Sequence, residues 1–239
     1  MNSNLVAVFE TVFNVVYLLV VWGLVILMAC RYQKVEAGNK AIARLVLIAF
    51  ILLASGDTGH VGFRVIAHMM NALDKQVMVF SAPMNLTGLG MMTTAYTVTI
   101  FYMVLVYAWM KQFNRNASWF TYLLLAMGIA RLIFMALPAN NWGNQVPPLA
   151  ISVWRNSFLW VQGIGIVWLL LSSAYQTHDR AFKWIGWSIV ASFAFYTPVI
   201  LLAPKYPLLG MLMIPKTCAY LVVAIIAYKA LWQPPIASK

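Results

Sequence analysis

Long apolar stretches, separated by short polar segments, recur along the whole chain. A helix needs about twenty apolar residues to cross the hydrocarbon core of a bilayer, and the pattern predicts seven such helices. The predicted spans are 5–30, 41–72, 84–110, 118–137, 149–174, 183–203 and 207–232. The polar segments between them are too short to fold alone. We therefore expect an all-α integral membrane protein, with residues 1–239 forming a single bundle of seven transmembrane helices.

The composition favours the same class of protein. Hydrophobic residues make up 63% of the 239 residues and charged residues only 9%, whereas a soluble domain carries about 25% charged residues. The first apolar run is too long for a signal peptide and follows no basic residue, so we expect a retained helix. Cys30 and Cys218 lie inside apolar runs, where we expect small buried side chains and no disulfide. The chain fits a multi-pass protein of a bacterial-type plasma membrane.

Basic residues are distributed unevenly between the two ends of the predicted spans. Only Lys75 and Lys205 lie in the connections at one end. The other end carries Arg31, Lys34, Lys40, Arg44, Lys111, Arg115, Arg180, Lys183, Lys229 and Lys239. Cytoplasmic loops are enriched in Lys and Arg, so we expect the N-terminus outside and the C-terminus in the cytoplasm. This asymmetry explains most of the net charge of +11 without a nucleic acid partner.

Four further cations lie within the predicted spans. They are Arg64, Arg131, Arg155 and Lys216. Ionisable residues inside a membrane are costly and indicate a functional site by default. Arg64 and Arg155 lie near enough to an interface for their side chains to reach it, and Lys216 could be the structural partner of an acid. Arg131 lies deepest in the predicted spans, so neither a side chain that reaches the interface nor a structural pairing with an acid explains it well.

The second span contains the segment GDTGHVGFRVIAH at residues 56–68, which has two distinct faces. One helical face carries Asp57, His60, Arg64 and His68, at spacings of three and four residues. The opposite face carries Gly56, Gly59 and Gly62. Small residues at such spacing let a neighbouring helix approach closely. We therefore predict a tight packing face and a polar face on this span.

Polar residues of the other spans fall at a similar depth, in the outer half of the bundle. They are Glu10, Asn14, Asn85, Arg131, Arg155, Asn156, Tyr196 and Lys216, together with a stripe of Ser188, Ser192 and Tyr196. This common depth predicts one polar pocket that opens to the outside, closed from the cytoplasm by an apolar inner half. In particular, we expect Asp57, His60, Arg131 and Lys216 to line it.

The charges of this layer do not balance. Glu10 and Asp57 face four cations, and uncompensated buried charge is expensive. We therefore expect an anionic ligand, such as a phosphate, a carboxylate or a lipid head group, which the arginine fork suits. A metal is not expected, because zinc would lie among arginines and no second histidine matches the depth of His60. We also expect no cofactor.

Three classes of function remain open. The first is an enzyme, such as a hydrolase, that acts on a membrane lipid or another anionic amphiphile. Asp57 and His60 would do its acid–base work, with His60 neutral near pH 7. The proposed ligand-binding residues are Glu10, Asn14, Arg64, Asn85, Arg131, Arg155, Asn156, Tyr196 and Lys216.

The second class is a transporter of a small anion, against which the chain shows no inverted repeat. The third is a sensor, which would need a partner because the inner loops are too small to signal alone. A homo-oligomer and a partner membrane protein both remain open.

Two motifs resemble those of microbial rhodopsins. The sixth span contains FAFYTPVI, and the last span contains a lysine, Lys216. In that family, which also has seven spans and an outside N-terminus, this lysine binds retinal as a Schiff base. The third span here lacks the arginine and the acidic counterion that the family pattern requires. Three arginines near an iminium ion would also be unfavourable. A retinal-binding, rhodopsin-like protein is therefore a minor alternative.

Overall fold

The computed structural model describes residues 3–70, 76–79, 82–143 and 148–233, with side chains from Val12 onward except those of His68, Val79, Ala82 and Pro207. Within these ranges, seven helices are long and apolar enough to cross a membrane. They are α1 (Ser3–Cys30), α2 (Lys40–Met69), α3 (Leu86–Gln112), α4 (Trp119–Ala136), α5 (Leu149–Gln176), α6 (Arg180–Leu202) and α7 (Met213–Trp232). The helical class is confirmed, and these helices indicate a multi-pass membrane protein.

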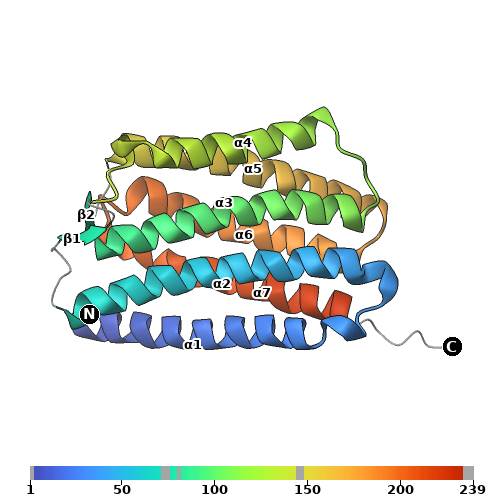
Figure 1. Cartoon of the computed structure of the whole chain (residues 1–239), viewed down its shortest axis with the longest axis horizontal. Coiled ribbons are helices and arrows are strands. Elements are labelled where there is room, and N and C mark those ends of the chain that lie inside the picture. Colours follow the sequence, from blue (N-terminus) through green and yellow to red (C-terminus); the bar gives the residue numbers. More distant parts are fainter. Residues whose placement is uncertain (1–2, 71–75, 80–81, 144–147, 234–239) are drawn as a thin grey trace.

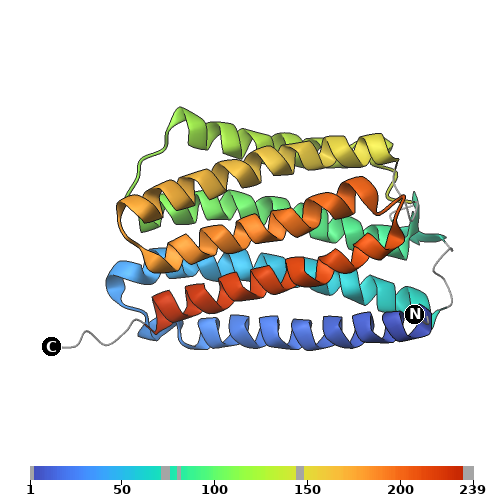
Figure 2. The ribbon, with the colours of Figure 1, turned by 180° about the vertical axis from the view of Figure 1, so that it is seen from behind.

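The helices run lengthwise beside one another in two layers. Figure 1 shows α2, α3 and α4 in front, and Figure 2 shows α5, α6 and α7 on the reverse side. Consecutive helices pack against each other, and α1 contacts both α2 and α7, so the bundle closes on itself. The start of α1 lies at one end of the bundle, and the α1–α2, α3–α4 and α5–α6 connections lie at the other.

A β-hairpin and a 3-10 helix, both at the end of the bundle where α1 begins, were not predicted from the sequence. Strands β1 (Gln76–Val79) and β2 (Ala82–Asn85) form an antiparallel hairpin in which Val77 pairs with Met84. Four residues per strand are too few for a recognisable period-two pattern beside a long apolar span. Residues 207–212 form a 3-10 helix, so α7 begins later than predicted. Such tight turns are frequent at helix N-termini.

The predicted packing face of α2 is confirmed at two of its three glycines. A Cβ atom at Gly56 would overlap the Thr97 hydroxyl of α3, and one at Gly59 would lie 2.7 Å from the Thr93 methyl. Thr94 Oγ1 also donates a 2.9 Å hydrogen bond to the Gly56 carbonyl. At Gly62 a Cβ atom would meet nothing within 4 Å, so that part of the prediction is wrong. The α2–α3 contact fixes the helix that carries Asp57 and His60.

This packing predicts opposite effects for two alanine substitutions on the same helix. We expect Gly56→Ala to lower the free energy of unfolding by about 1–3 kcal/mol, because overpacking a close contact forces the helices apart. Gly62→Ala should instead raise stability by up to about 1 kcal/mol, because alanine favours the helix and meets no neighbour. Denaturant titration of both purified variants measures the difference, and equal stabilities would contradict the α2–α3 geometry.

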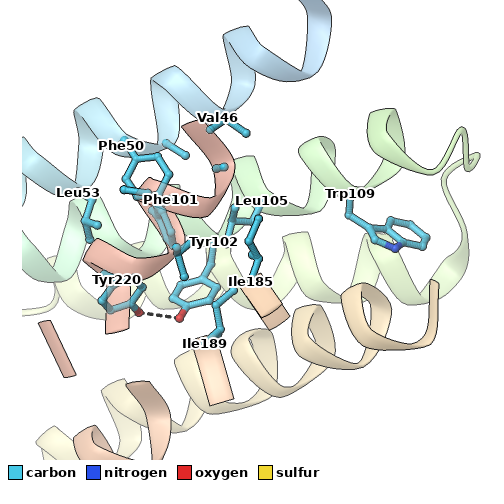
Figure 3. Packing of buried hydrophobic residues seen from close by; sticks show 14 of the residues in the cluster. Val46, Phe50, Leu53, Phe101, Tyr102, Leu105, Trp109, Ile185, Ile189 and Tyr220 are labelled. Atoms are coloured by element: carbon cyan, nitrogen blue, oxygen red, sulfur yellow. Dashed lines mark hydrogen bonds between the residues drawn. The ribbon is translucent and has the colours of Figure 1, made fainter. Parts of the chain in front are cut away.

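The half of the bundle away from the N-terminus is packed with apolar and aromatic side chains. Figure 3 shows Phe50 of α2, Phe101 and Tyr102 of α3, and Tyr220 of α7 meeting at the centre. The Tyr102 and Tyr220 hydroxyls share a 2.7 Å hydrogen bond. Further along, Trp109 Nε1 donates to the Leu169 carbonyl at 2.9 Å. This core agrees with the predicted apolar half that closes the polar layer at one end.

The perimeter of the bundle exposes large apolar side chains, as expected for a surface that faces lipid. Examples are Leu19, Ile26, Ile133, Ile164 and Trp168. Cys30 and Cys218 are free and also lie exposed on this surface, which corrects the expectation that both are buried. Their apolar neighbours in sequence did not distinguish a lipid-facing position from a core position.

Candidate functional site

A cavity of about 560 Å³ lies inside the half of the bundle where α1 begins. Its volume falls in the range of pockets that enclose one drug-sized molecule, about 300–1,000 Å³. All seven α-helices contribute to its walls. The polar and charged side chains that line it are those of Asn14, Tyr17, Asp57, His60, Arg64, Thr94, Arg131, Arg155, Ser192, Tyr196, Lys216, Thr217 and Tyr220.

Apolar side chains line several walls of the cavity, and those on α2, α3, α5 and the middle of α6 are Val61, Met91, Ala95, Val98, Leu159 and Phe193. A further group lies near the end of the bundle, on the last turn of α6, the 3-10 helix and the first turn of α7. We call these residues the apolar rim: Val199, Ile200, Leu208, Met211, Met213 and Ile214. Ser192 and Asp57 lie further toward the middle of their helices, whereas Lys216 is the fourth residue of α7. The cavity therefore has charged groups such as Asp57 in its depth and the apolar rim nearer the end of the bundle.

Asp57 joins three helices at the cavity. The Tyr17 hydroxyl of α1 donates a 2.6 Å hydrogen bond to Asp57 Oδ2. Lys216 of α7 lies near enough for its positive charge to act on the carboxylate. Because a carboxylate has about four acceptor sites, Asp57 can accept further hydrogen bonds from a ligand or water.

His60 lies one turn after Asp57, where α2 packs closely against α3. A Cβ atom at Gly90 would lie 3.0 Å from His60 Cα. His60 lines the cavity, and its Nδ1 atom is buried without a hydrogen-bond partner among the described residues. Buried polar atoms usually have a partner. The contact with Gly90 therefore fixes the backbone that carries the ring, and one ring nitrogen is left for a ligand, a water or a proton.

Arg131 is the most deeply buried of the described cations, with 2% of its surface exposed. Its Nε atom donates to the Arg155 carbonyl at 3.0 Å, and its Nη1 atom donates to Thr99 Oγ1 at 2.8 Å. These bonds tie α4 to α5 and α3. They use part of the five-donor guanidinium fork, and Arg131 also lines the cavity.

Arg155 lies on α5 with its guanidinium carbon 4.3 Å from the centre of the Trp142 ring. Trp142 is itself held by a 3.0 Å hydrogen bond from its Nε1 to the Met135 carbonyl. Arg155 lines the cavity, and its Nη1 atom is buried with no hydrogen-bond partner in the described part of the chain. A positioned cation with an unused donor is suited to an anion.

Lys216 projects into the cavity between two aromatic rings. Its Nζ atom lies 5.2 Å from the centre of the Tyr196 ring and 5.4 Å from that of Tyr220. Such positions stabilise an ammonium through the ring face. The Tyr196 hydroxyl donates a 2.9 Å hydrogen bond to Asn156 Oδ1, which fixes its ring. No hydrogen bond or ion pair joins Lys216 to another described residue, so its donors are available.

The structure brings most of the predicted site residues to one cavity. Those that line it are Asp57, His60, Asn14, Arg64, Arg131, Arg155, Tyr196 and Lys216. Asn156 is buried behind Tyr196. Asn85 caps α3, where its side chain accepts a 2.8 Å hydrogen bond from the Thr87 amide. The side chain of Glu10, like that of His68, lies outside the described part. Catalytic or binding roles for all these residues remain predictions.

Several residues of the site did not emerge from the sequence. Tyr17 and Tyr220 contact Asp57 and Lys216, and Thr99 holds Arg131. Helical spacing offered a signal for two of them. Tyr17 lies three residues after Asn14, and Tyr220 four residues after Lys216, so each pair shares a helix face. Thr99 could not be found in this way, because its partner lies on another helix.

The charge of the site is strongly unequal. Among the described side chains, four cations and one carboxylate line the cavity: Arg64, Arg131, Arg155, Lys216 and Asp57. In the same part of the chain, no three His, Cys, Asp or Glu side chains gather in a way that could hold a metal. No family model matches the sequence, and neither a curated protein nor a solved structure matches it significantly.

Proposed function

We propose that this protein binds an anionic amphiphile in the cavity, with the head group at Arg131, Arg155 and Lys216. The observation that carries the proposal is the surplus of cations around one enclosed space. Arg155 and Lys216 have unused donors there, and only Asp57 supplies a described negative charge. Uncompensated buried charge is expensive, so an anion that neutralises it gains affinity.

The apolar rim supports an amphiphile over a small inorganic anion. A free phosphate would fill only the charged part of the cavity and leave apolar side chains such as Ile200 and Ile214 against water. An alkyl chain on the head group would bury that surface, at about 25 cal/mol per Å². The proposed ligand therefore has an anionic head and an apolar tail, as membrane lipids and their precursors do.

We further propose that the cavity faces the outside of the cell. The end of the bundle away from the cavity carries the connections rich in basic residues, including Arg31, Lys111 and Arg180. Short cytoplasmic loops have this excess of Lys and Arg. The N-terminus would then lie outside, and the ligand would come from the outer leaflet.

Acid–base chemistry on the bound ligand is the second part of the proposal. His60 and Asp57 lie in the same cavity as the cations, and His60 has an unpartnered ring nitrogen. A neutral His60 would accept a proton from the attacking water, and the cations would stabilise the developing negative charge. Binding without turnover would instead favour a sensor, and flux of the anion across a vesicle membrane would favour a transporter.

A binding measurement with matched lysine variants tests the site. The protein in nanodiscs of zwitterionic lipid should bind radiolabelled dodecyl phosphate saturably. We expect Lys216→Met to weaken this binding by about ten- to a hundredfold, the value of one charge-assisted hydrogen bond. Lys229→Met, an exposed position at the other end of the same helix, should leave it unchanged.

The same preparation can contradict the proposal. Equal affinity of the two lysine variants would place the bound probe elsewhere on the protein. A rhodopsin-like protein would instead form a Schiff base with added retinal through Lys216, which a visible absorption band would reveal.

A further inference from the structure

We infer that the ligand carries a single alkyl chain, and that this chain lies along the apolar rim while the head group points into the depth of the cavity. This inference rests on the proposed function and specifies its substrate class. The shared chemistry is a carboxylate or phosphate head on one chain, as in a fatty acid or a lysophospholipid.

The direction of the ligand follows from the positions of the charges. Asp57 and Ser192 lie well inside their helices, as does Thr99, which holds Arg131, whereas Val199 and Ile200 lie in the last turn of α6. A head group that paired with the cations would therefore lie deeper than its tail. The reverse orientation would place apolar carbon against an ammonium and a carboxylate, and would leave the head group against the rim.

The number of chains follows from the volume of the cavity. A space of about 560 Å³ suits one alkyl chain with its head group and is too small to enclose a two-chain phospholipid. The apolar rim gives that one chain a continuous path along α6, the 3-10 helix and α7. On α2, by contrast, the apolar lining residue Val61 lies between the polar residues His60 and Arg64.

The exit of the chain is marked by Leu208. Its side chain lines the cavity and is also 76% exposed, so it lies where the cavity meets the surroundings of the bundle. Leu201 and Leu202, just before it in sequence, are exposed as well. The terminal carbons of the chain would leave the cavity beside Leu208 and enter the lipid around the protein.

Photocrosslinking locates the two ends of the ligand directly. The full chain in zwitterionic nanodiscs is given dodecyl phosphate with a diazirine either near the methyl end or beside the phosphate. We expect the methyl-end probe to label residues 199–214, and the head-group probe to label residues nearer Lys216 and Tyr220. Unlabelled dodecyl phosphate or laurate should compete with both probes, whereas a two-chain phosphatidate should compete at least tenfold less well.

A pair of tryptophan variants tests the rim without relying on the charged residues. Ile214→Trp should reduce labelling by the methyl-end probe at least fivefold, because the larger side chain fills the wall. Val222→Trp on the same helix is 45% exposed, away from the cavity lining, and should have no effect. The affinity for butyl phosphate, whose chain is too short to follow the rim, should be equal in the two variants.

Each alternative outcome identifies what fails. Competed labelling with the methyl end deep in the cavity, or equal competition by the two-chain lipid, would overturn this inference and leave anion binding intact. Equal effects of Ile214→Trp and Val222→Trp would also overturn it. The absence of competed labelling with both probes would overturn the proposed function itself.

Discussion

Replacing Arg131 with leucine is expected to lower the free energy of unfolding by about 3–6 kcal/mol, because it removes two buried hydrogen bonds from a charged donor, each of which contributes about 1.5–3 kcal/mol. The substitution leaves the Arg155 carbonyl and Thr99 Oγ1 without the donor that now satisfies them. It also removes the deepest cation of the cavity, so binding of dodecyl phosphate should fall together with stability.

The matched control is Arg180→Leu, an exposed arginine at the first turn of α6. It should change stability by less than about 0.5 kcal/mol. Titration with a denaturing detergent, followed by helical content, compares the two variants. Arg131→Lys keeps the charge but not the fork, so it should bind the probe more weakly than the wild type while folding better than Arg131→Leu. Equal stability of both leucine variants would show that the hydrogen bonds of Arg131 do not stabilise the bundle.

Replacing His60 with glutamine is expected to abolish turnover while preserving the anion site. A suitable substrate is dodecyl 4-nitrophenyl phosphate, an anionic amphiphile whose hydrolysis releases coloured 4-nitrophenol. Loss of a general base typically costs 10²–10⁴-fold in rate, so we expect at least a hundredfold lower hydrolysis. The affinity for dodecyl phosphate should change by less than about threefold, because glutamine is similar in size and leaves the cations in place.

Asp57→Asn separates catalysis from packing in the same experiment. Its carboxylate accepts the Tyr17 hydrogen bond, and a bond to a charged group contributes about 1.5–3 kcal/mol. This variant should therefore lose stability as well as turnover, whereas His60→Gln should lose turnover alone. Unchanged hydrolysis by His60→Gln would remove its catalytic role. Binding without hydrolysis by the wild-type protein would favour a sensor or a transporter.

The sequence predicted the helices well because membrane insertion imposes a strong and simple pattern. A run of about twenty apolar residues between charged segments has few structural alternatives to a transmembrane helix. The bounds of α1, α5 and α6 agree with the predicted spans within a few residues. The hairpin at Gln76–Asn85 could not be predicted, because backbone pairing of such short strands leaves little trace in side-chain hydrophobicity. The prediction that Cys30 and Cys218 are buried was wrong for a related reason. Lipid and protein core are equally apolar, so hydrophobicity does not say which one a residue faces.

The candidate site was predictable to the extent that helical geometry decides it. Asp57, His60 and Lys216 were expected at one depth, and they line one cavity. The contacts between helices were not predictable. No spacing within one helix indicates that Thr99 holds Arg131 or that Trp142 supports Arg155, because these pairs depend on how separate helices are rotated and packed. Asn85 caps α3, as an asparagine at a helix start often does, and its predicted role in binding stays a prediction.

The central claim is that the cavity between Asp57, Arg131, Arg155 and Lys216 holds the head group of an anionic amphiphile. An electron cryomicroscopy structure of the protein in nanodiscs with dodecyl phosphate tests it most directly. The account predicts density for the phosphate within hydrogen-bonding distance of Lys216 Nζ and the Arg155 guanidinium, continuous with a chain along the apolar rim. A well-resolved cavity that contains only water, with the probe bound at the lipid-facing surface, would contradict it.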